Sequence, residues 1–177
     1  MPAMGIRSIF ARPLAALIAR ETADWSIRAG EVQKKILFKN IRAAQNTRFG
    51  KEHGFADIKT EEDYHRHVPV RDYEDLKPWI EAITAGEHNV LWPGKPAYLA
   101  KTSGTTSGTK YIPITKDSLP NHINSARNAL LNYVHETGRS TFLDGNLIFL
   151  SGSPSLDSVS GIPTGRLSGI VNHHVPP

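Results

Sequence analysis

Cysteine is absent from this sequence of 177 residues. The chain therefore has no disulfide framework, no thiol chemistry and no cysteine ligand for a metal, and a reducing cytoplasm would suit it. Long apolar runs are also missing, because no segment approaches the roughly 18 consecutive apolar residues that a membrane span needs. We therefore expect a cytoplasmic protein that crosses no bilayer and has no membrane partner.

Blocks of like charge are missing as well. The 21 lysines and arginines exceed the 17 acidic residues and give a net charge of +4, but they are scattered among acids and form no basic tail. A nucleic-acid partner is therefore not expected. The small excess of positive charge is weak support for an anionic ligand and does not indicate which one.

The first twenty residues contain three arginines and no acid, which superficially resembles a transit peptide. Their apolar residues recur at near-helical spacing, however, so a packing helix interrupted at Pro13 is the better interpretation. We expect the apolar side of this helix to consist of Ile6, Ile9, Phe10, Leu14, Leu17 and Ile18.

Helical patterns fill most of the first half of the chain. Residues 31–44 carry apolar residues on one side and predict an amphipathic helix. Thr60 begins a capping-box-like start of a short helix that has acids in its first turn. Pro78 is best placed as the first residue of a further helix, which stops near Gly86.

Strand patterns begin at Asn89. Residues 90–92 and 97–100 predict two short strands before a polar stretch, and residues 110–114 predict a strand after it. Residues 146–150 are an apolar run suited to a buried strand.

A further helix is expected after the third strand, with Ser118 or Thr115 as its N-cap, Pro120 in its first turn and an end near Gly138. We expect its buried face to consist of Ile123, Ala126, Leu130, Leu131 and Val134. The length of the chain is that of about one domain. The predicted fold is α/β, with a helical N-terminal half followed by a mixed β-sheet flanked by helices and a strand-turn-strand unit at the edge of the sheet.

The polar stretch from Lys101 to Thr115 is hard to explain by folding alone. It gathers small hydroxyl residues and two glycines into one run that ends in a lysine, between two short apolar segments. Glycine lets the backbone turn its amides toward a ligand, hydroxyls add short donors, and lysine adds a mobile positive charge. By base rate such a run is a solvated surface loop, but its composition is also that of a loop that holds an anion.

Two well-known phosphate loops do not fit this stretch. The Walker pattern fails because Gly104 and Gly108 are separated by three residues and Thr109 stands between the second glycine and Lys110. The dinucleotide fingerprint fails because no glycine lies two residues from Gly104 and no helix follows directly.

The run from Thr102 to Lys110, Thr-Ser-Gly-Thr-Thr-Ser-Gly-Thr-Lys, resembles the phosphate loop of the adenylate-forming enzymes. Its continuation Tyr-Ile-Pro-Ile-Thr is similar to the auxin-responsive acyl acid amido synthetase family, particularly its bacterial members. Three further stretches resemble the same family, namely residues 46–55, 68–74 and 161–170. The resemblance thus extends from about Asn46 to the last residue, and it outweighs the base rate for a surface loop.

The resemblance implies a two-step reaction. A carboxylic acid attacks the α-phosphate of ATP and releases pyrophosphate, and an amine, usually that of an amino acid, then opens the acyl-adenylate to give an amide. Charge builds on the departing phosphates, so fixed amides and hydroxyls stabilise that transition state. The resemblance assigns phosphate binding to Ser103, Gly104, Thr105, Thr106, Ser107 and Gly108, with Lys110 as a counter-charge. Mg²⁺ would arrive with the ATP, held mainly by phosphate oxygens.

The motifs that grip adenine and ribose in the family, and its C-terminal lysine, cannot be located in this sequence. We therefore expect residues 1–177 to be the N-terminal part of a longer adenylating domain, with no ligase turnover alone. Two other functions stay open: an adenylating ligase that uses a thiol such as coenzyme A, and a noncatalytic nucleotide-binding or interaction module. Neither the catalytic residues nor the oligomeric state can be named.

Three further features of the sequence each have a functional and a structural interpretation. The helix after residue 115 either lines the acyl pocket with Arg127 toward substrate, as the family suggests, or is core with Arg127 on the surface. His173 and His174 are adjacent and lack an acidic cluster, which favours a structural or surface role over a metal site. A hydrolase pair built on Ser103 is a poor option because the Gly-x-Ser-x-Gly elbow is missing.

Overall fold

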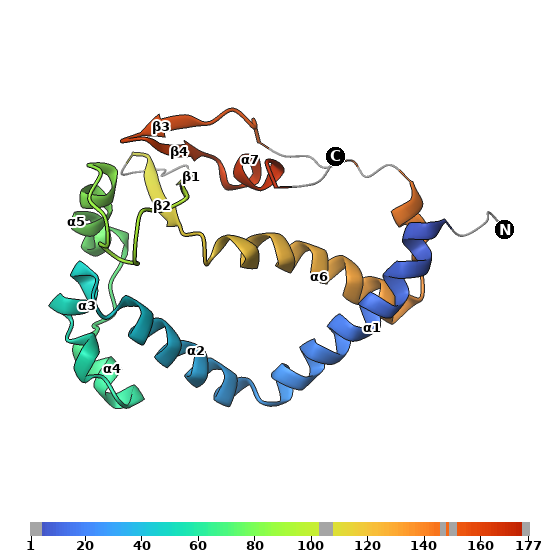
Figure 1. Ribbon diagram of the computed structural model, residues 1–177, viewed down its shortest axis with the longest axis horizontal. Helices are drawn as coiled ribbons and strands as arrows, with labels where there is room; N and C mark the ends of the chain where they lie inside the picture. Colours follow the sequence, from blue (N-terminus) through green and yellow to red (C-terminus); the bar gives the residue numbers. More distant parts are fainter. Residues whose placement is uncertain (1–4, 103–107, 146–147, 149–151, 175–177) are drawn as a thin grey trace. The chain divides into compact units, whose positions relative to one another are not determined.

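The computed structural model describes residues 5–102, 108–145, 148 and 152–174 of the chain. The chain divides into two compact units, one made of Met1–Val32 with Pro120–Leu150 and the other of Gln33–Leu119 with Ser151–Pro177. The predicted α/β class is confirmed, because a helical N-terminal part is followed by a mixed four-stranded sheet with helices (Figure 1). None of the described helices is both long and apolar enough to span a membrane.

The first unit is built on helices α1 (Ile6–Ile27) and α6 (Leu119–Thr137), with the 3-10 turn η2 (Thr141–Asp144). Its core consists of Ala15 and Ile18 of α1 and Leu131 and Val134 of α6. The carboxylate of Asp144 accepts hydrogen bonds from the backbone N–H groups of Gly5 (2.9 Å) and Ser8 (3.2 Å). A carboxylate is well suited to pair with these N–H groups, which have no partner within the helix. The hydrogen bond from the Ser8 hydroxyl, followed by those from the two backbone N–H groups, lowers the pKa of Asp144 below its usual value.

Two expectations for α1 are wrong. The helix is not interrupted at Pro13 but continues through it. The residues it buries are Ser8, Ala11, Ala15 and Ile18, whereas the large apolar residues Ile6, Ile9, Phe10, Leu14 and Leu17 are exposed. Three of these four buried residues are small, which lets the neighbouring backbone approach closely, as the hydrogen bond from the Ser8 hydroxyl to the Ser140 carbonyl (2.7 Å) shows.

Helix α6 agrees with its sequence signals at both ends. Thr115 and Ser118 exchange hydrogen bonds of 3.0 Å between backbone N–H groups and hydroxyls just before the helix, and Gly138 follows its end with a φ of +66°. Of its expected buried face, only Leu131 and Val134 are fully buried; Leu130 and Ala126 are exposed.

The second unit begins with helices α2 (Ala29–Ala44, which starts in the first unit), α3 (Arg48–Glu52) and α4 (Glu61–His67), and with the 3-10 turn η1 (Phe55–Asp57). The predicted amphipathic helix is α2, and its Ile41 and Ala44 form a core with Phe55 and Ile58. The predicted capping box of α4 is confirmed: the Thr60 hydroxyl accepts from the backbone N–H of Asp63 (3.1 Å), and the Asp63 carboxylate accepts from that of Thr60 (2.9 Å).

Helix α5 (Tyr73–Thr84) starts earlier than expected. Asp72 is its N-cap and forms a capping box with Asp75, so Pro78 lies inside the helix and not at its first position. The predicted stop near Gly86 is confirmed by its φ of +98° and by its N–H, which donates to the Ile83 carbonyl (3.0 Å).

The sheet has the strand order β2-β1-β4-β3 and is formed by β1 (Tyr98–Thr102), β2 (Lys110–Ile114), β3 (Asp157–Val159) and β4 (Ile162–Gly165). Strand β1 pairs antiparallel with β2 and parallel with β4, and β3 pairs antiparallel with β4. Ile83 of α5 packs with Leu99 and Ile162 on one face. Ile170 of α7 (Leu167–Asn172) packs with Ala100 and Ile114 on the other, so the sheet lies between helices as predicted.

Residues 90–92 do not form the predicted strand. Val90 is buried (1% exposed) in the core of α5 and the sheet, but its carbonyl accepts a hydrogen bond from the Phe49 N–H (3.0 Å), and the Asn89 carbonyl accepts one from the Arg48 N–H (2.8 Å). The start of α3 thus takes the place of a strand partner. The strand predicted at residues 146–150 lies outside the described residues except for Ile148, which is exposed.

Candidate anion-binding site

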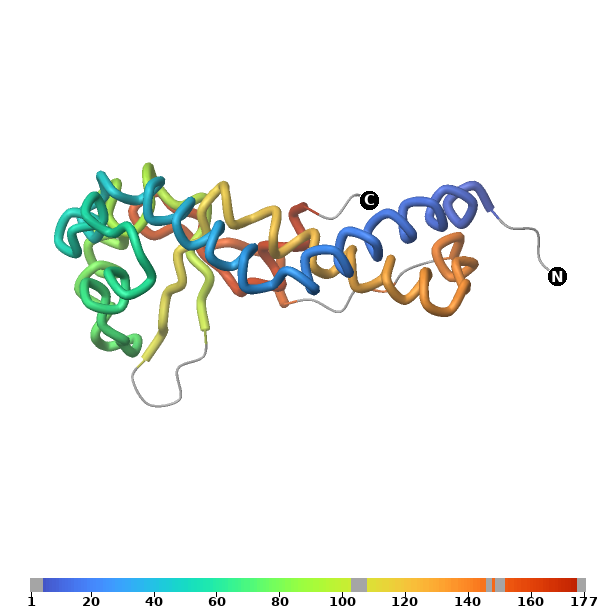
Figure 2. Tube along the Cα trace, turned by 90° about the horizontal axis from the view of Figure 1, so that it is seen from below, coloured from blue at the N-terminus to red at the C-terminus, as the bar shows by residue number. Residues whose placement is uncertain are grey.

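Strands β1 and β2 form a hairpin whose last residue pair is Thr102 with Lys110 (Figure 2). The sequence therefore places the glycine- and hydroxyl-rich run between the ends of two paired strands, and β2 is the edge of the sheet, as expected. Of the predicted site residues, Ser103, Gly104, Thr105, Thr106 and Ser107 lie outside the described part of the chain. Gly108 and Lys110 are described.

Gly108 has a φ of +81°, in the left-handed region that residues with a β-carbon avoid. Apart from the two neighbouring residues, no atom of the described part of the chain lies within 4 Å of a β-carbon added there. The glycine is therefore required by the backbone conformation and not by crowding.

Lys110 extends its side chain toward the first turn of α5. Its ammonium lies 4.8 Å from the centroid of the Tyr73 ring and 3.9 Å from a carboxylate oxygen of Glu74. The Lys110 side chain is 31% exposed and that of Glu74 is 49% exposed. The ammonium is thus held loosely, by a ring face and a solvated carboxylate.

The Tyr73 hydroxyl also binds the main chain of β2. It accepts a hydrogen bond from the backbone N–H of Tyr111 (2.9 Å) and lies 3.5 Å from the carbonyl oxygen of the same residue. An edge strand leaves such groups without a strand partner, and the hydroxyl fills that role here. Sequence reasoning missed Tyr73 and Glu74, because Pro78 was placed at the start of their helix.

Lys101, at the start of the polar stretch, has other partners than Lys110. It pairs with Tyr111 across the hairpin, whereas Lys110 pairs with Thr102, so the alternation of strand side chains directs the two lysines to opposite faces. Its ammonium lies 2.5 Å from an Asp157 carboxylate oxygen of β3. This hydrogen bond raises the pKa of Lys101 and lowers that of Asp157.

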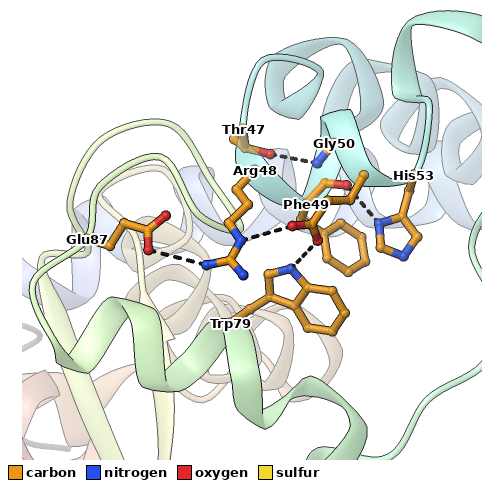
Figure 3. A network of polar contacts seen from close by, with 8 residues as sticks. Thr47, Arg48, Phe49, Gly50, His53, Trp79 and Glu87 are labelled. Atoms are coloured by element: carbon orange, nitrogen blue, oxygen red, sulfur yellow. Dashed lines mark hydrogen bonds and ion pairs between the residues drawn. The ribbon is translucent and has the colours of Figure 1, made fainter.

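The helix that contacts Lys110 is tied to α3 by a polar network (Figure 3). The Arg48 guanidinium donates to the carboxylates of Glu52 (2.9 Å) and Glu87 (3.3 Å), and the Trp79 indole N–H donates to the other oxygen of Glu52 (2.8 Å). The hydrogen bond from Arg48 is the largest cause that lowers the pKa of Glu52. Helix α5 is therefore anchored at Trp79, which lies six residues after Tyr73, the residue that touches β2.

Aromatic side chains add to the contact between α3 and α5. Phe49 stacks on His53 with centroids 3.9 Å apart and meets Trp79 edge-on at 5.1 Å. The Arg71 guanidinium carbon lies 5.2 Å from the Trp79 centroid and 5.9 Å from that of Phe49. Such cation–π and edge contacts add to burial in fixing the approach of two helices.

The remaining candidates have structural or surface roles. His173 contacts the Pro154 carbonyl (2.6 Å) and His174 contacts the Tyr98 hydroxyl (3.1 Å), which agrees with the interpretation favoured for this pair. Arg127 is exposed and donates to the Asn128 side chain. In the ranges that the structure describes, no three or more His, Asp or Glu side chains are grouped so that they could hold a metal ion.

These features define an α/β domain whose edge hairpin carries a glycine- and hydroxyl-rich connection that ends in a lysine. The family model described as the GH3 family N-terminal domain matches residues 19–175, which is most of the chain. The chain therefore belongs to the GH3 family, and the resemblance derived from the loop and its flanks is confirmed.

Curated relatives match shorter stretches. The indole-3-acetic acid-amido synthetase GH3.15 of Arabidopsis thaliana is 37% identical over 82 residues, which cover 45% of this chain and 14% of the relative. The probable indole-3-acetic acid-amido synthetase GH3.13 of Oryza sativa subsp. japonica is 33% identical over 102 residues (52% and 22%). The jasmonoyl-L-amino acid synthetase JAR6 of Nicotiana attenuata is 26% identical over 102 residues (56% and 18%). The matched part of the chain thus spans less than a quarter of these relatives.

Proposed function

We propose that residues 1–177 form the N-terminal part of an adenylating domain in an acyl acid amido synthetase. Membership of the GH3 family supports this proposal, because the relatives named above are amido synthetases that act on indole-3-acetic acid or form jasmonoyl-amino acid conjugates. The substrates would be ATP, a small carboxylic acid and an amino acid or other amine. The identity of the acid and the amine is left open.

The reaction would proceed in two steps. A carboxylate oxygen of the acid bonds to the α-phosphorus of ATP, and the bond from that phosphorus to the bridging oxygen breaks, so that pyrophosphate leaves. The amine nitrogen then attacks the acyl carbon, AMP leaves, and the nitrogen loses a proton. Negative charge grows on the pyrophosphate in the first step, and donors that are fixed beforehand stabilise that charge best.

The role of this chain would be to hold the β and γ phosphates. The single observation that carries the proposal is the position of the run from Ser103 to Lys110 in the edge hairpin of a GH3 domain. Gly108, with its left-handed backbone and no β-carbon, fits an oxygen that approaches the main chain. Lys110 fits as a counter-charge because the carboxylate that pairs with it among the described residues, that of Glu74, is half exposed and 3.9 Å away. Mg²⁺ would enter with the nucleotide and be held mainly by its phosphates.

Equilibrium binding of ATP and of AMP to this chain tests the proposal. We expect a Ser103→Ala, Thr105→Ala double variant to bind ATP at least about tenfold more weakly, because a hydrogen bond to a charged group contributes roughly 1.5–3 kcal/mol. AMP affinity should change little, since AMP lacks the β and γ phosphates. A Ser125→Ala, Thr137→Ala variant of α6 is the matched control, as it also removes one serine and one threonine hydroxyl. Equal ATP affinity in the wild type and the loop variant would overturn the proposal.

A further inference from the structure

Tyr73 contacts β2 at two consecutive residues. Its hydroxyl binds the backbone N–H of Tyr111 at 2.9 Å, and its ring lies 4.8 Å from the ammonium of Lys110. The hydroxyl therefore fixes the main chain one residue after Lys110, while the ring limits the directions in which the Lys110 side chain can point. Neither contact belongs to the core clusters that hold the sheet together.

Glu74, the next residue of α5, competes for the same ammonium. The ion pair is long (3.9 Å), both side chains are substantially exposed, and the same carboxylate also lies 3.8 Å from the ammonium of Lys77. Exposed pairs of this kind are weak. A ligand with several negative charges would displace Glu74 easily, whereas the Tyr73 ring can stay in place under the ammonium.

We propose that Tyr73 is a positioning residue for Lys110 and that Glu74 is the counter-ion which a bound phosphate group must displace. This rests on the proposed function in one respect, namely that the incoming anion is a nucleotide phosphate. Tyr73 keeps the ammonium beside the first turn of α5, at the end of β2 that follows the polar run. Glu74 holds the charge until the phosphate arrives and so lowers the affinity of the site.

Three variants separate these contributions in ATP titrations. Tyr73→Phe removes the hydroxyl contact alone and should weaken ATP binding about two- to fivefold. Tyr73→Leu also removes the ring and should weaken it about tenfold. Glu74→Gln should tighten ATP binding about two- to fivefold, because the competing charge is gone. Tyr64→Phe in α4, where the ring packs against the core of α2 and η1, is the control for the loss of a tyrosine hydroxyl and should leave ATP affinity unchanged.

A purely structural role for Tyr73 would produce similar losses through a distorted sheet, so the variants are combined with Lys110→Met. If Tyr73 acts through Lys110, the loss caused by Tyr73→Leu nearly disappears in the Lys110→Met background, because the two residues share one interaction. Losses that simply multiply would overturn the proposal. Should Tyr73→Leu fail to fold, the same cycle is run with Tyr73→Phe.

Nuclear magnetic resonance of the free chain tests the positioning without nucleotide. In protein labelled with ¹³C-lysine, the ε-methylene signal of Lys110, assigned by its loss in Lys110→Met, should be shifted upfield by the Tyr73 ring and return toward the other lysines in Tyr73→Leu. An identical Lys110 signal in both proteins would overturn the positioning role. If the signal behaves as expected but the wild type shows no ATP saturation, the nucleotide proposal fails while the positioning stands.

Discussion

Replacing Gly50 by alanine should destabilise the protein, although Gly50 lies in helix α3, where alanine is intrinsically the better residue. A β-carbon at this position would lie 2.1 Å from the carbonyl oxygen of Ala44 and 3.0 Å from its carbonyl carbon. An ordinary carbon–oxygen contact is about 3.3 Å or longer. The end of α2 would therefore have to move by about 1 Å.

The size of the effect follows from what that carbonyl does. It accepts hydrogen bonds from the backbone N–H (3.0 Å) and the hydroxyl (2.7 Å) of Thr47, and this hydroxyl in turn caps α3 by accepting from the Gly50 N–H (3.0 Å; Figure 3). Overpacking typically costs about 1–3 kcal/mol, and each weakened buried hydrogen bond adds about 1 kcal/mol. The higher helix propensity of alanine offsets about 1 kcal/mol of this loss. We expect a net loss of about 2–4 kcal/mol in the free energy of unfolding.

Urea denaturation followed by tryptophan fluorescence measures this loss. A Trp25→Phe background leaves Trp79 and Trp92, which both lie in the same unit as Gly50, as the only reporters. Lys51→Ala, an exposed position in the same helix, should change the free energy of unfolding by less than about 0.5 kcal/mol. Gly30→Ala in α2, where an added β-carbon meets no atom within 4 Å, should raise the denaturation midpoint measured by circular dichroism. Unfolding of Gly50→Ala at the same or higher urea concentration than the wild type would refute the steric reasoning.

Three more predictions follow from single residues. Hydrogen bonds from the backbone of Lys59, then from the hydroxyl and backbone of Thr60, lower the pKa of Asp63 from 3.8 to about 2. The ionised carboxylate therefore stabilises the fold above pH 3.8, and this stabilisation is lost as the pH falls toward 2. In Asp63→Asn, the melting temperature should change less over this pH range. Leu99→Ala, at a fully buried position of β1, should cost about 2.7–5 kcal/mol in urea denaturation. Gly108→Ala and Gly94→Ala, with left-handed φ values of +81° and +82°, should each lower the free energy of unfolding by about 1–2 kcal/mol. Isothermal titration should show weaker ATP binding only for Gly108→Ala.

The features that could be predicted from the sequence depend on neighbouring residues. The capping box of Thr60 and Asp63, the strand at residues 110–114 and the end of α6 before Gly138 all result from signals within one or two turns. The family was also readable from the order of glycine and hydroxyl residues around Lys110. The capping box and the helix end are predictable because their hydrogen bonds close within the segment itself, and the strand because its partner β1 lies just before it in the chain.

Features that depend on distant partners were not predictable. Val90 is apolar and buried, as a strand residue would be, yet its carbonyl pairs with the start of α3, about forty residues earlier in the chain. In α1 the buried stripe includes Ser8, which no hydrophobic pattern selects, because Asp144 and the Ser140 carbonyl bind its hydroxyl. Burial is decided there by polar partners more than a hundred residues away.

The error at Pro78 and the failure to find Tyr73 and Glu74 have one cause. A proline inside a helix leaves the carbonyl four residues earlier without its helical donor and is strongly disfavoured there, so the sequence favours a start at Pro78. The structure starts α5 at Tyr73, because Asp72 and Asp75 close a capping box and Ile80 and Ile83 are buried (5% and 3% exposed) against the rest of the unit.

Only the early start brings Tyr73 and Glu74 into a first helical turn beside β2, where they reach Lys110 and the Tyr111 N–H. The carbonyl that Pro78 leaves without a helical donor is that of Glu74 itself. Helix α5 therefore lacks one backbone hydrogen bond near its start, while its first turn places a hydroxyl, a ring and a carboxylate against the end of the hairpin. If Pro78→Ala stabilises the protein without changing ATP affinity, the proline has no part in this placement; if it also alters the affinity, the proline helps to set the position of the first turn.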